Sequence, residues 1–394
     1  MSKTIARLGR RIRLGIIGGG VGSFIGAVHR TAARLDDHYE VVASVLSSNY
    51  ERSRLQGRGI GIAEDRAYGS AEEFFTEEAK RTDGIEVVAI MTPNDSHCML
   101  SHMAIDFGLH MICDKPLATN LLDAVRLAAR VKDSGLVFCH TFNYSGYPMV
   151  RQARAMIRDR DLGEIHMVNV CYVQGHNAAL TDGERGIAPT NWHFRAEQAG
   201  PSLILGDIGS HAHHIASFIT GLHVAEVMAD IGNVVPGRDA HDYAGILVRL
   251  SNRARGVLWV TQAAAGAVHG LHFRVFGEKG GLEWFQEEPN QLLNFRLGQP
   301  AITFERNGPG MKPEALRASR VGIGHPEGYH DAFAVLYTDA AEAIVARLLG
   351  DRHGLLSIDL PTAEDGVRTM KFIDAAITSS RLGQWVQCEP YEKV

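Results

Sequence analysis

The four residues Cys113-Asp114-Lys115-Pro116 close a short apolar run and directly precede a stretch with helical spacing. A lysine at the carboxyl end of a strand, next to a proline, points its amine into the crevice where α/β sheets bind ligands. There it can act as an acid, a base or an electrostatic clamp. The alternative is an ordinary surface lysine at a strand end. The segment therefore predicts a ligand-facing lysine, provided that the surrounding elements build such a crevice.

A second group of polar residues lies in Gly206–His214 and combines a carboxylate with imidazoles. Asp207 and His211 are four residues apart, so on a helix they share one face and can form a proton-handling pair. The carboxylate would orient the imidazole and favour its protonated form. One alternative is a helix-capping Asp with surface histidines. Another is a metal site formed by Asp207, His211 and His214, but the spacing and cysteines of structural zinc sites are missing, so no metal is predicted.

The glycine-rich stretch Gly18-Gly19-Gly20-Val21-Gly22-Ser23 follows the first apolar run and opens a helical pattern. Glycines at this place allow a tight turn and let backbone N–H groups approach a pyrophosphate. Read from Gly18, the third glycine of G-x-G-x-x-G is replaced by Ser23. The motif alone is weak, but its position between a strand and a helix predicts dinucleotide binding.

The end of the second apolar run bears on which dinucleotide is bound. An acid at this place usually holds the ribose, whereas this run ends at Ser47-Ser48-Asn49. Serines can bond either a 2′-hydroxyl or a 2′-phosphate, and Arg52 is close enough in sequence to pair with a phosphate. We expect NAD, because no arginine directly follows the strand, and keep NADP as the alternative.

The elements that must position these residues change character along the chain. Up to about residue 146, short apolar runs rich in β-branched residues alternate with helical patterns, as in parallel strands covered on both faces. The runs are Leu14–Ile17, Val41–Leu46, Val87–Met91, Met111–Cys113 and Val137–Cys139. This order implies right-handed crossovers and a doubly wound Rossmann sheet over residues 11–146. Polar residues after two of these strands, Thr92–His97 and Thr141–Tyr144, should share the sheet edge that carries Lys115.

From residue 147 to 394, strand patterns follow one another with few helices between them, which predicts an α+β domain with a large, mainly antiparallel sheet. The expected strands are Ile165–Val173, Ala225–Ile231, Ala244–Leu250, Gly256–Thr261 and Leu271–Phe276. The expected helices are Met149–Arg158, Ile208–Ile219, Tyr329–Leu348 and Thr362–Ser380. Two stretches rich in Gly, Pro and charge, Ala178–Pro189 and Arg306–His325, are expected to be mobile loops.

Composition limits the classes of partner. The 394 residues are 45% apolar with a formal net charge of -5, which argues against a nucleic-acid surface. No apolar run is long enough to span a bilayer. Five scattered cysteines, without a Cys-x-x-Cys pair, indicate reduced thiols. We therefore expect a cytoplasmic protein with no nucleic-acid or membrane partner.

The ordered set of motifs resembles the Gfo/Idh/MocA family (glucose–fructose oxidoreductase, inositol dehydrogenase, rhizopine catabolism) over nearly the whole chain. The matching segments are Val41–Leu46, Thr92-Pro93-Asn94-x-x-His97, Cys113–Pro116, Asn143-Tyr144, Asp207-x-Gly209-x-His211 and Phe276–Gly281. The resemblance implies a Rossmann domain and a second domain with a large sheet, through which we expect homo-oligomers to form. It also implies nicotinamide-dependent chemistry on a sugar-like substrate.

The resemblance assigns roles residue by residue. It implies catalytic roles for Lys115, Asp207 and His211. It implies cofactor contacts for Gly18, Gly20, Val21, Gly22, Ser47, Ser48, Thr92, Asn94, His97, Asp114, Lys115 and Asn143. It implies substrate contacts for Tyr144, Trp192, His193, Arg195 and His214. The sequence departs from the family pattern in having Asp114 where Glu is usual, Ser47 where an acid often binds ribose, and His214 where Asp or Asn is common.

These residues predict an NAD(P)-dependent oxidoreductase acting on a ring hydroxyl or ketone of a sugar, glycoside or cyclitol. His211 is the natural base near neutral pH, Asp207 would orient it, and Lys115 would polarise the reacting oxygen. We expect Lys115 and His211 to meet at the nicotinamide, although they come from different domains. One alternative is an NAD-dependent glycosidase that oxidises the sugar only transiently. Another is a non-catalytic, nucleotide-binding sensor of the same fold.

Overall fold

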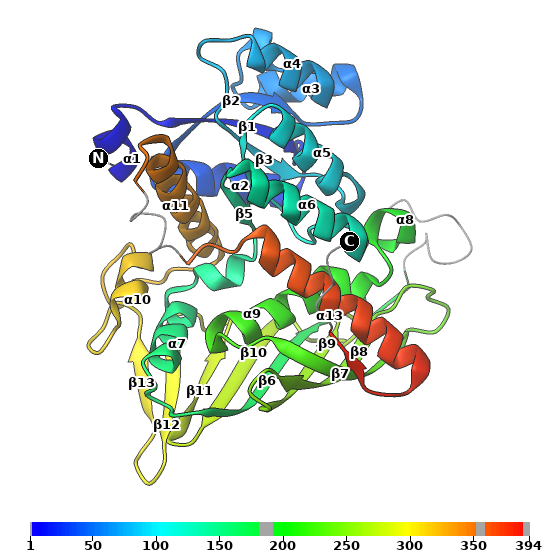
Figure 1. The fold of residues 1–394 in the computed structure, drawn as a ribbon, viewed down its shortest axis with the longest axis vertical. Helices are drawn as coiled ribbons and strands as arrows, with labels where there is room; N and C mark the ends of the chain where they lie inside the picture. The colour runs from blue at the N-terminus through cyan, green and yellow to red at the C-terminus, as the bar shows by residue number, and fades with distance from the viewer. Residues whose placement is uncertain (1, 181–191, 352–358, 389–394) are drawn as a thin grey trace. The chain divides into compact units, whose positions relative to one another are not determined.

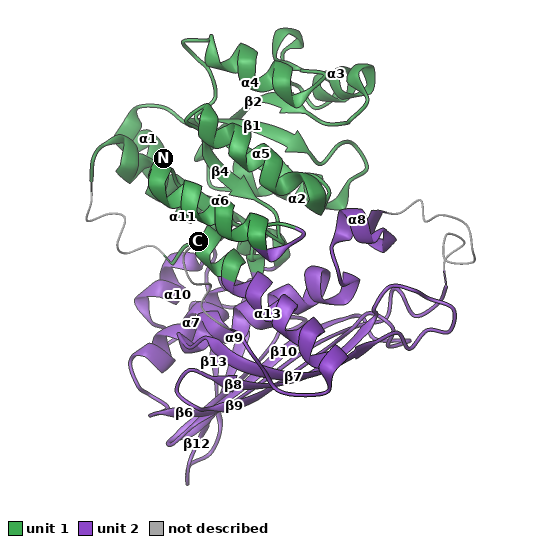
Figure 2. Cartoon of the chain, turned by 45° about the vertical axis from the view of Figure 1, so that its right-hand side comes forward, with its two compact units in different colours: residues 1–118, 122–143, 329–367 green, residues 119–121, 144–328, 368–394 purple. Residues whose placement is uncertain are grey.

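The computed structural model describes residues 2–180, 192–351 and 359–388, and the chain divides into two compact units (Figures 1 and 2). Unit 1 comprises residues 1–118, 122–143 and 329–367. Unit 2 comprises residues 119–121, 144–328 and 368–394. Both units therefore contain more than one stretch of the chain.

Unit 1 is built on a parallel sheet with the strand order β2-β1-β3-β4-β5, as the alternation of apolar runs and helices predicts. Its strands are β1 (Ile12–Gly18), β2 (Tyr39–Val45), β3 (Val87–Met91), β4 (His110–Cys113) and β5 (Phe138–His140). Its helices are α1 (Lys3–Leu8), α2 (Phe24–Leu35), α3 (Tyr50–Gly59), α4 (Ala71–Ala79), α5 (Asn94–Asp106), α6 (Leu121–Ser134) and α11 (Tyr329–Leu348). The order reverses between β1 and β3, and α/β sheets bind ligands at such a switch point.

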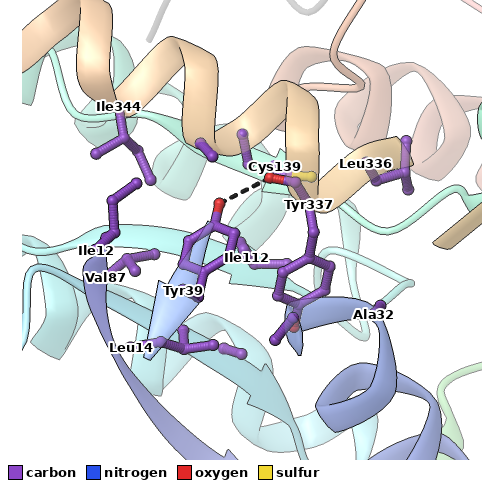
Figure 3. Close-up of a cluster of buried hydrophobic side chains, with 14 of the residues drawn as sticks. Ile12, Leu14, Ala32, Tyr39, Val87, Ile112, Cys139, Leu336, Tyr337 and Ile344 are labelled. Atoms are coloured by element: carbon purple, nitrogen blue, oxygen red, sulfur yellow. Dashed lines mark hydrogen bonds between the residues drawn. The ribbon is translucent and has the colours of Figure 1, made fainter. Parts of the chain in front are cut away.

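Helix α11 returns to unit 1 from the far end of the sequence. Its apolar side chains share one buried core with strands β1 to β5 and helix α2 (Figure 3). Within that core the Tyr39 hydroxyl donates a hydrogen bond of 2.8 Å to the Tyr337 carbonyl. The domain boundary predicted at residue 146 would place α11 in the second domain. The structure places this helix on the Rossmann sheet, because that sheet buries its apolar face.

Unit 2 is built on a nine-stranded sheet with the order β13-β12-β11-β10-β6-β9-β8-β7-β14. Its strands are β6 (Ile165–Gln174), β7 (Val224–Gly232), β8 (Tyr243–Leu250), β9 (Arg255–Thr261), β10 (His269–Gly277), β11 (Gly280–Phe285), β12 (Gln291–Arg296), β13 (Ile302–Glu305) and β14 (Val386–Gln387). The strands pair antiparallel except β6 and β9, which are parallel. The predicted fold class, a Rossmann sheet with a second, mainly antiparallel sheet, is confirmed.

Helices cover one face of the unit 2 sheet. They include α7 (Pro148–Arg158), α9 (Ser210–Thr220) and α13 (Ala363–Leu382), while α10 (Pro313–Ala318) packs on α7. The predicted loop Arg306–His325 contains α10 and is anchored by a buried ion pair, in which Arg306 Nη1 lies 2.7 Å from Glu327 Oε1. The predicted loop Ala178–Pro189 falls outside the described residues from 181 onward. In the described part of the chain, no helix is both long and apolar enough to cross a membrane.

Candidate active site

The carboxyl edge of the unit 1 sheet gathers most of the residues predicted to bind cofactor. Parallel strands end at a common edge, and polar residues follow each strand there. Gly18 ends β1, Ser47 and Ser48 follow β2, Thr92 and Asn94 follow β3, Asp114 and Lys115 follow β4, and Asn143 follows β5. The fold of unit 1 therefore places these residues on one edge of the sheet, as the sequence predicts.

The turn after β1 has the backbone that its glycines permit. The angle φ is 85° at Gly18, 63° at Gly19 and 92° at Gly22, a region that favours glycine. A Cβ on Gly18 would lie 2.5 Å from the Met91 carbonyl oxygen, whereas a Cβ on Gly22 would meet nothing within 4 Å. Gly22 thus borders open space at the start of α2. Backbone N–H groups at a helix N-terminus favour a phosphate group.

Close packing of α2 on this turn depends on a glycine outside the predicted motif. Ser23, at the third motif position, caps the helix by accepting a hydrogen bond of 3.3 Å from the N–H of Gly26. A Cβ on Gly26 would lie 2.0 Å from the carbonyl oxygen of Gly19, a backbone atom. Gly26 therefore permits the close helix–strand contact that the third glycine of the motif usually permits. The signal for it was a glycine one turn later than the motif requires.

The two serines after β2 lie where the ribose is usually held. Ser47 is half-buried, and its hydroxyl oxygen accepts a hydrogen bond of 3.1 Å from the N–H of Asn49, while Ser48 is exposed. Asn49 in turn caps α3 by accepting a hydrogen bond of 2.9 Å from the N–H of Arg52. The strand end therefore offers hydroxyl groups in place of a carboxylate. A ribose contact by Ser47 and Ser48 stays a prediction.

Next to Lys115 in the chain, Asp114 is held by two hydrogen bonds. Its Oδ1 atom accepts from the Thr141 hydroxyl at 2.5 Å and from His29 Nε2 at 3.0 Å, and His29 Nδ1 lies 2.8 Å from the Tyr337 hydroxyl. Burial alone would raise the pKa of Asp114, but the electrostatic interaction with His29 and the two hydrogen bonds outweigh burial and hold the pKa at about 2. A fixed negative charge therefore adjoins Lys115.

Unit 1 also has features that fit a bound dinucleotide. The glycine turn leads directly into α2, so its N–H groups are placed for a pyrophosphate. The Nδ2 atom of Asn143, after β5, is buried and lacks a hydrogen-bond partner among the described residues. A buried donor of this kind suits a polar ligand group. His97, which was predicted to contact the cofactor, is 1% exposed. Both of its ring nitrogens already face main-chain carbonyl groups and are therefore not directed at a ligand.

In unit 2, the predicted helix that carries Asp207 and His211 begins with an irregular turn. Asp207 lies in the π-helical turn η5 (Leu205–Gly209), and His211 lies in the first turn of α9. Single π-turns are rare in proteins overall, but many of those that occur lie at functional sites. Asp207 is half-buried and His211 is 8% exposed. The sequence pattern predicts a regular helix from Ile208, and it gives no sign of the π-turn.

A chain of hydrogen bonds begins at Asp207 and runs across the inner face of the unit 2 sheet. Asp207 Oδ2 accepts from Gln262 Nε2 at 2.6 Å, and Gln262 Nε2 also donates to Gln174 Oε1 at 3.2 Å. The Gln174 amide nitrogen donates to His269 Nδ1 at 3.1 Å. The chain thus leads from the predicted catalytic acid to a second histidine.

The same chain continues from His269 to two tyrosines beside His211. The Tyr172 hydroxyl lies 3.0 Å from His269 Nε2 and is hydrogen-bonded to the Tyr144 hydroxyl. The Tyr144 ring meets the His211 ring edge-on, with centroids 4.9 Å apart and planes at 86°. Burial lowers the pKa of His269, and the nearby His176 lowers it further. At neutral pH, His269 is therefore neutral and can accept one of these hydrogen bonds.

The unit 2 site includes four residues that sequence reasoning missed: Tyr172, Gln174, Gln262 and His269. Tyr172 and Gln174 occupy inward positions of β6, whose earlier inward positions are the apolar Val168 and Val170. Polar side chains at inward positions near a strand end were the available signal. Gln262 and His269 join them only through the pairing of β9 and β10 with β6, which the sequence does not reveal.

The remaining predicted substrate residues lie on other parts of unit 2. Trp192 and His193 stack on each other in a short 3-10 turn (Trp192–Phe194), and the exposed Arg195 precedes α8 (Ala196–Ala199). His214 is 5% exposed and stacks on Phe218 within α9. Substrate contacts by Trp192, His193, Arg195 and His214 stay predictions.

Comparison with known proteins assigns both halves of the chain. Residues 12–142 match the oxidoreductase family with an NAD-binding Rossmann fold, and residues 150–283 match the GFO/IDH/MocA C-terminal domain. An uncharacterized oxidoreductase of Bacillus subtilis, YfiI, is 31% identical over 96% of this chain and 98% of its own length. The chain belongs to the Gfo/Idh/MocA oxidoreductase family.

Two further similar proteins are named for an activity or contain bound ligands. The crystal structure of an inositol dehydrogenase homolog from Azotobacter vinelandii, complexed with NADH and myo-inositol, has a TM-score of 0.90 and 34% identity over 98% of this chain and 99% of that chain. The levoglucosan dehydrogenase of Pseudarthrobacter phenanthrenivorans is 26% identical over 77% of this chain and 80% of its own length.

Family membership identifies unit 1 as an NAD-binding Rossmann fold and the chain as an oxidoreductase. Lys115 lies within the Rossmann match, and Asp207, His211 and Gln262 lie within the C-terminal match. Among residues 2–180, 192–351 and 359–388, no group of three or more His, Cys, Asp or Glu side chains is placed to hold a metal ion.

Proposed function

We propose that this Gfo/Idh/MocA protein is an NAD-dependent dehydrogenase that moves a hydride between nicotinamide and a ring hydroxyl or ketone of a sugar or cyclitol. The observation that carries the proposal is the hydrogen-bonded chain from Tyr144 to Asp207. Its hydroxyl, imidazole, amide and carboxylate groups are the groups that hydrogen-bond a polyol. A polyol can form hydrogen bonds with such groups, whereas an apolar substrate offers them no donor or acceptor. Relatives named for myo-inositol and levoglucosan support the same class of substrate.

Each catalytic residue has a distinct part in the proposed reaction. When bound, NAD supplies the hydride acceptor at the oxidised carbon. His211 takes the hydroxyl proton as the hydride leaves, and Asp207 stabilises the charge that His211 gains. Lys115 donates a hydrogen bond to the reacting oxygen. In the opposite direction the same groups return the proton, so one site serves oxidation and reduction.

The open face of the unit 2 sheet supports a proposed homo-oligomer. The helices cover the other face, and several large apolar side chains on the open face are exposed. They are Met167, Leu247, Val257, Trp259 and Phe285. Strand pairing places Val257 opposite Leu247 in β8, and Trp259 lies two residues further along β9 on the same face of the sheet. A second copy of the chain would remove this apolar surface from water.

The experiment that tests the proposal is a substrate scan with nicotinamide absorbance as the readout. Free sugars, anhydrosugars and inositols are each incubated with the protein and with NAD or NADP. We expect cofactor reduction with at least one polyol, and faster reduction with NAD than with NADP. A glycoside that loses its aglycone without net cofactor reduction, or the absence of reduction with every polyol, would contradict the proposal.

A further inference from the structure

Three buried histidines of unit 1 surround the segment Cys113–Pro116 that carries Lys115. His140, at the end of β5, places Nδ1 at 3.2 Å from the Cys113 carbonyl oxygen. His29, on α2, reaches the Asp114 carboxylate as described above. His97, on α5, places Nδ1 at 2.8 Å from the Pro116 carbonyl oxygen. The backbone is therefore hydrogen-bonded to imidazoles on both sides of Lys115.

His97 differs from the other two histidines in the number of protons that its contacts need. Its second ring nitrogen, Nε2, lies 2.9 Å from the Thr92 carbonyl oxygen, so both ring nitrogens face carbonyl groups. A carbonyl oxygen only accepts hydrogen bonds, and a neutral imidazole has only one N–H. Two such bonds at once therefore require the doubly protonated imidazolium. A neutral ring would turn a lone pair toward one carbonyl oxygen.

His140 shows the contrasting case in the same part of unit 1. It has one carbonyl partner, that of Cys113, and its Nε2 atom has no hydrogen-bond partner among the described residues. Burial lowers the pKa of His140 to about 4, so this ring is neutral and one N–H is enough for its contact. The two buried rings thus require different protonation states, and the number of carbonyl acceptors sets the difference.

The groups around His97 can balance a buried positive charge. The Asp114 carboxylate is close enough for its pKa to be lowered by the charge of His97. His140, a second titratable ring near His97, is neutral and adds no like charge. Lys115 is the remaining charged group of the segment, adjacent to Pro116. One carboxylate therefore offsets the imidazolium from the β4 side, and a buried charge paired in this way is tolerable.

We propose that His97 is a positioning residue, a buried imidazolium that ties the Pro116 carbonyl beside Lys115 to the Thr92 carbonyl at the end of β3. This inference rests on the proposed function only in taking Lys115 as a residue that acts on substrate. By fixing the backbone next to Lys115, His97 limits where the lysine amine can lie. Misplacement of a catalytic group by about 1 Å can cost about 100-fold in rate.

The protonation state of His97 is testable without any enzyme assay. In neutron diffraction from a deuterated crystal of the whole chain at pH 7, we expect deuterium on both Nδ1 and Nε2 of His97. We expect deuterium on only one ring nitrogen of His140, which serves as the internal control. A single deuterium on His97 would overturn the proposal. This readout is unaffected if the substrate or the role of Lys115 is different from the one proposed here.

Two isosteric variants separate the two hydrogen bonds of His97. The amide nitrogen of Asn matches the position of Nδ1, so His97→Asn retains the donor to Pro116, whereas His97→Gln matches Nε2 and retains the donor to Thr92. With the polyol selected by the substrate scan, we expect kcat to fall by about 100-fold in His97→Gln and by clearly less in His97→Asn. The Kd for NAD, measured by fluorescence titration, should change less than kcat in both variants.

Three results would contradict the positioning role. They are equal kcat losses in the Asn and Gln variants, a kcat of the wild-type value in His97→Gln, and a loss confined to NAD affinity. If Lys115→Ala retained turnover, the proposed function would fail, but the neutron result on His97 would still decide its protonation state.

Discussion

Replacing Asp114 by Asn should destabilise the folded chain by about 2 kcal/mol at neutral pH. The pKa of Asp114 falls from its ordinary value of 3.8 to about 2, and each pKa unit corresponds to about 1.4 kcal/mol. The folded state therefore stabilises the ionised form of Asp114 by about 2 kcal/mol more than the unfolded state does. Asn keeps the shape and can still accept from Thr141 and His29, so the loss reports mainly the charge.

The pH dependence of this loss has a definite sign. Because the folded-state pKa is depressed, the stabilisation is fully present above about pH 4 and is lost as the pH falls towards 2. Urea unfolding followed by circular dichroism measures the free energy of unfolding at each pH. The difference between wild type and Asp114→Asn should be larger at pH 5 than at pH 3. Asp133→Asn, which removes an exposed acid from α6, is the control and should change stability by less than about 0.5 kcal/mol.

Repeating the Asp114→Asn measurement in a His29→Gln background tests why the pKa of Asp114 is depressed. The interaction of His29 with the Asp114 carboxylate is the largest effect that opposes burial, so the cost of Asp114→Asn should shrink clearly in a His29→Gln background. Equal costs in the two backgrounds would refute the argument that His29 holds Asp114 ionised. A cost that grew as the pH fell from 4 towards 2 would refute the sign.

Three further outcomes follow from the structure. His140 should contribute a loss of about 3 kcal/mol in stability between about pH 6.5 and pH 4, because burial lowers its pKa to about 4. His140→Gln should reduce the slope of this part of the stability curve from urea unfolding, and an unchanged slope would contradict the assignment. Gly26→Ala should lower the free energy of unfolding by about 1–3 kcal/mol and weaken NAD binding, because its Cβ would lie 2.0 Å from a backbone oxygen. Gly59→Ala is the control, because its Cβ would meet open space, and it should change neither the thermal melt nor the NAD titration. Trp259→Arg on the open sheet face should shift sedimentation towards a smaller species, and unchanged sedimentation would show that this face is not the interface.

Local pattern predicted much of unit 1, because its strands are short apolar runs and its helices are amphipathic. Helix α2 begins at Phe24, directly after the glycine-rich stretch, where the sequence predicts a helical pattern. The segment Ser70-x-x-Glu73 forms half of a capping box at the start of α4. Ser70 accepts a hydrogen bond from the N–H of Glu73, but the Glu73 carboxylate accepts from the N–H of Gly69 instead of that of Ser70. Helix α3 was not predicted, since its sequence is polar and contains two glycines, and the packing of its few buried side chains decides its conformation.

Features that depend on tertiary contacts could not be predicted from the sequence. Helix α11 is visible as a pattern, but only folding shows that it packs with the Rossmann sheet. Spacing and motif order pointed to Lys115, Asp207 and His211 as candidates. The network through Gln262 and His269 depends on the register of strands that are distant in sequence. The two carbonyl partners of His97 also come from different strand ends, so its protonation state follows only from the structure.

Turnover and NAD affinity, measured separately for Lys115→Ala and His211→Ala, test the central claim most directly. General acid–base groups typically contribute about 10²–10⁴-fold, and we expect a loss of that size in kcat for each variant. The Kd for NAD of His211→Ala should stay near the wild-type value, because His211 belongs to unit 2 and the NAD-binding Rossmann fold is in unit 1. Near-normal kcat in either variant would contradict the proposed mechanism, and loss of NAD binding in His211→Ala would contradict the division of roles between the two units.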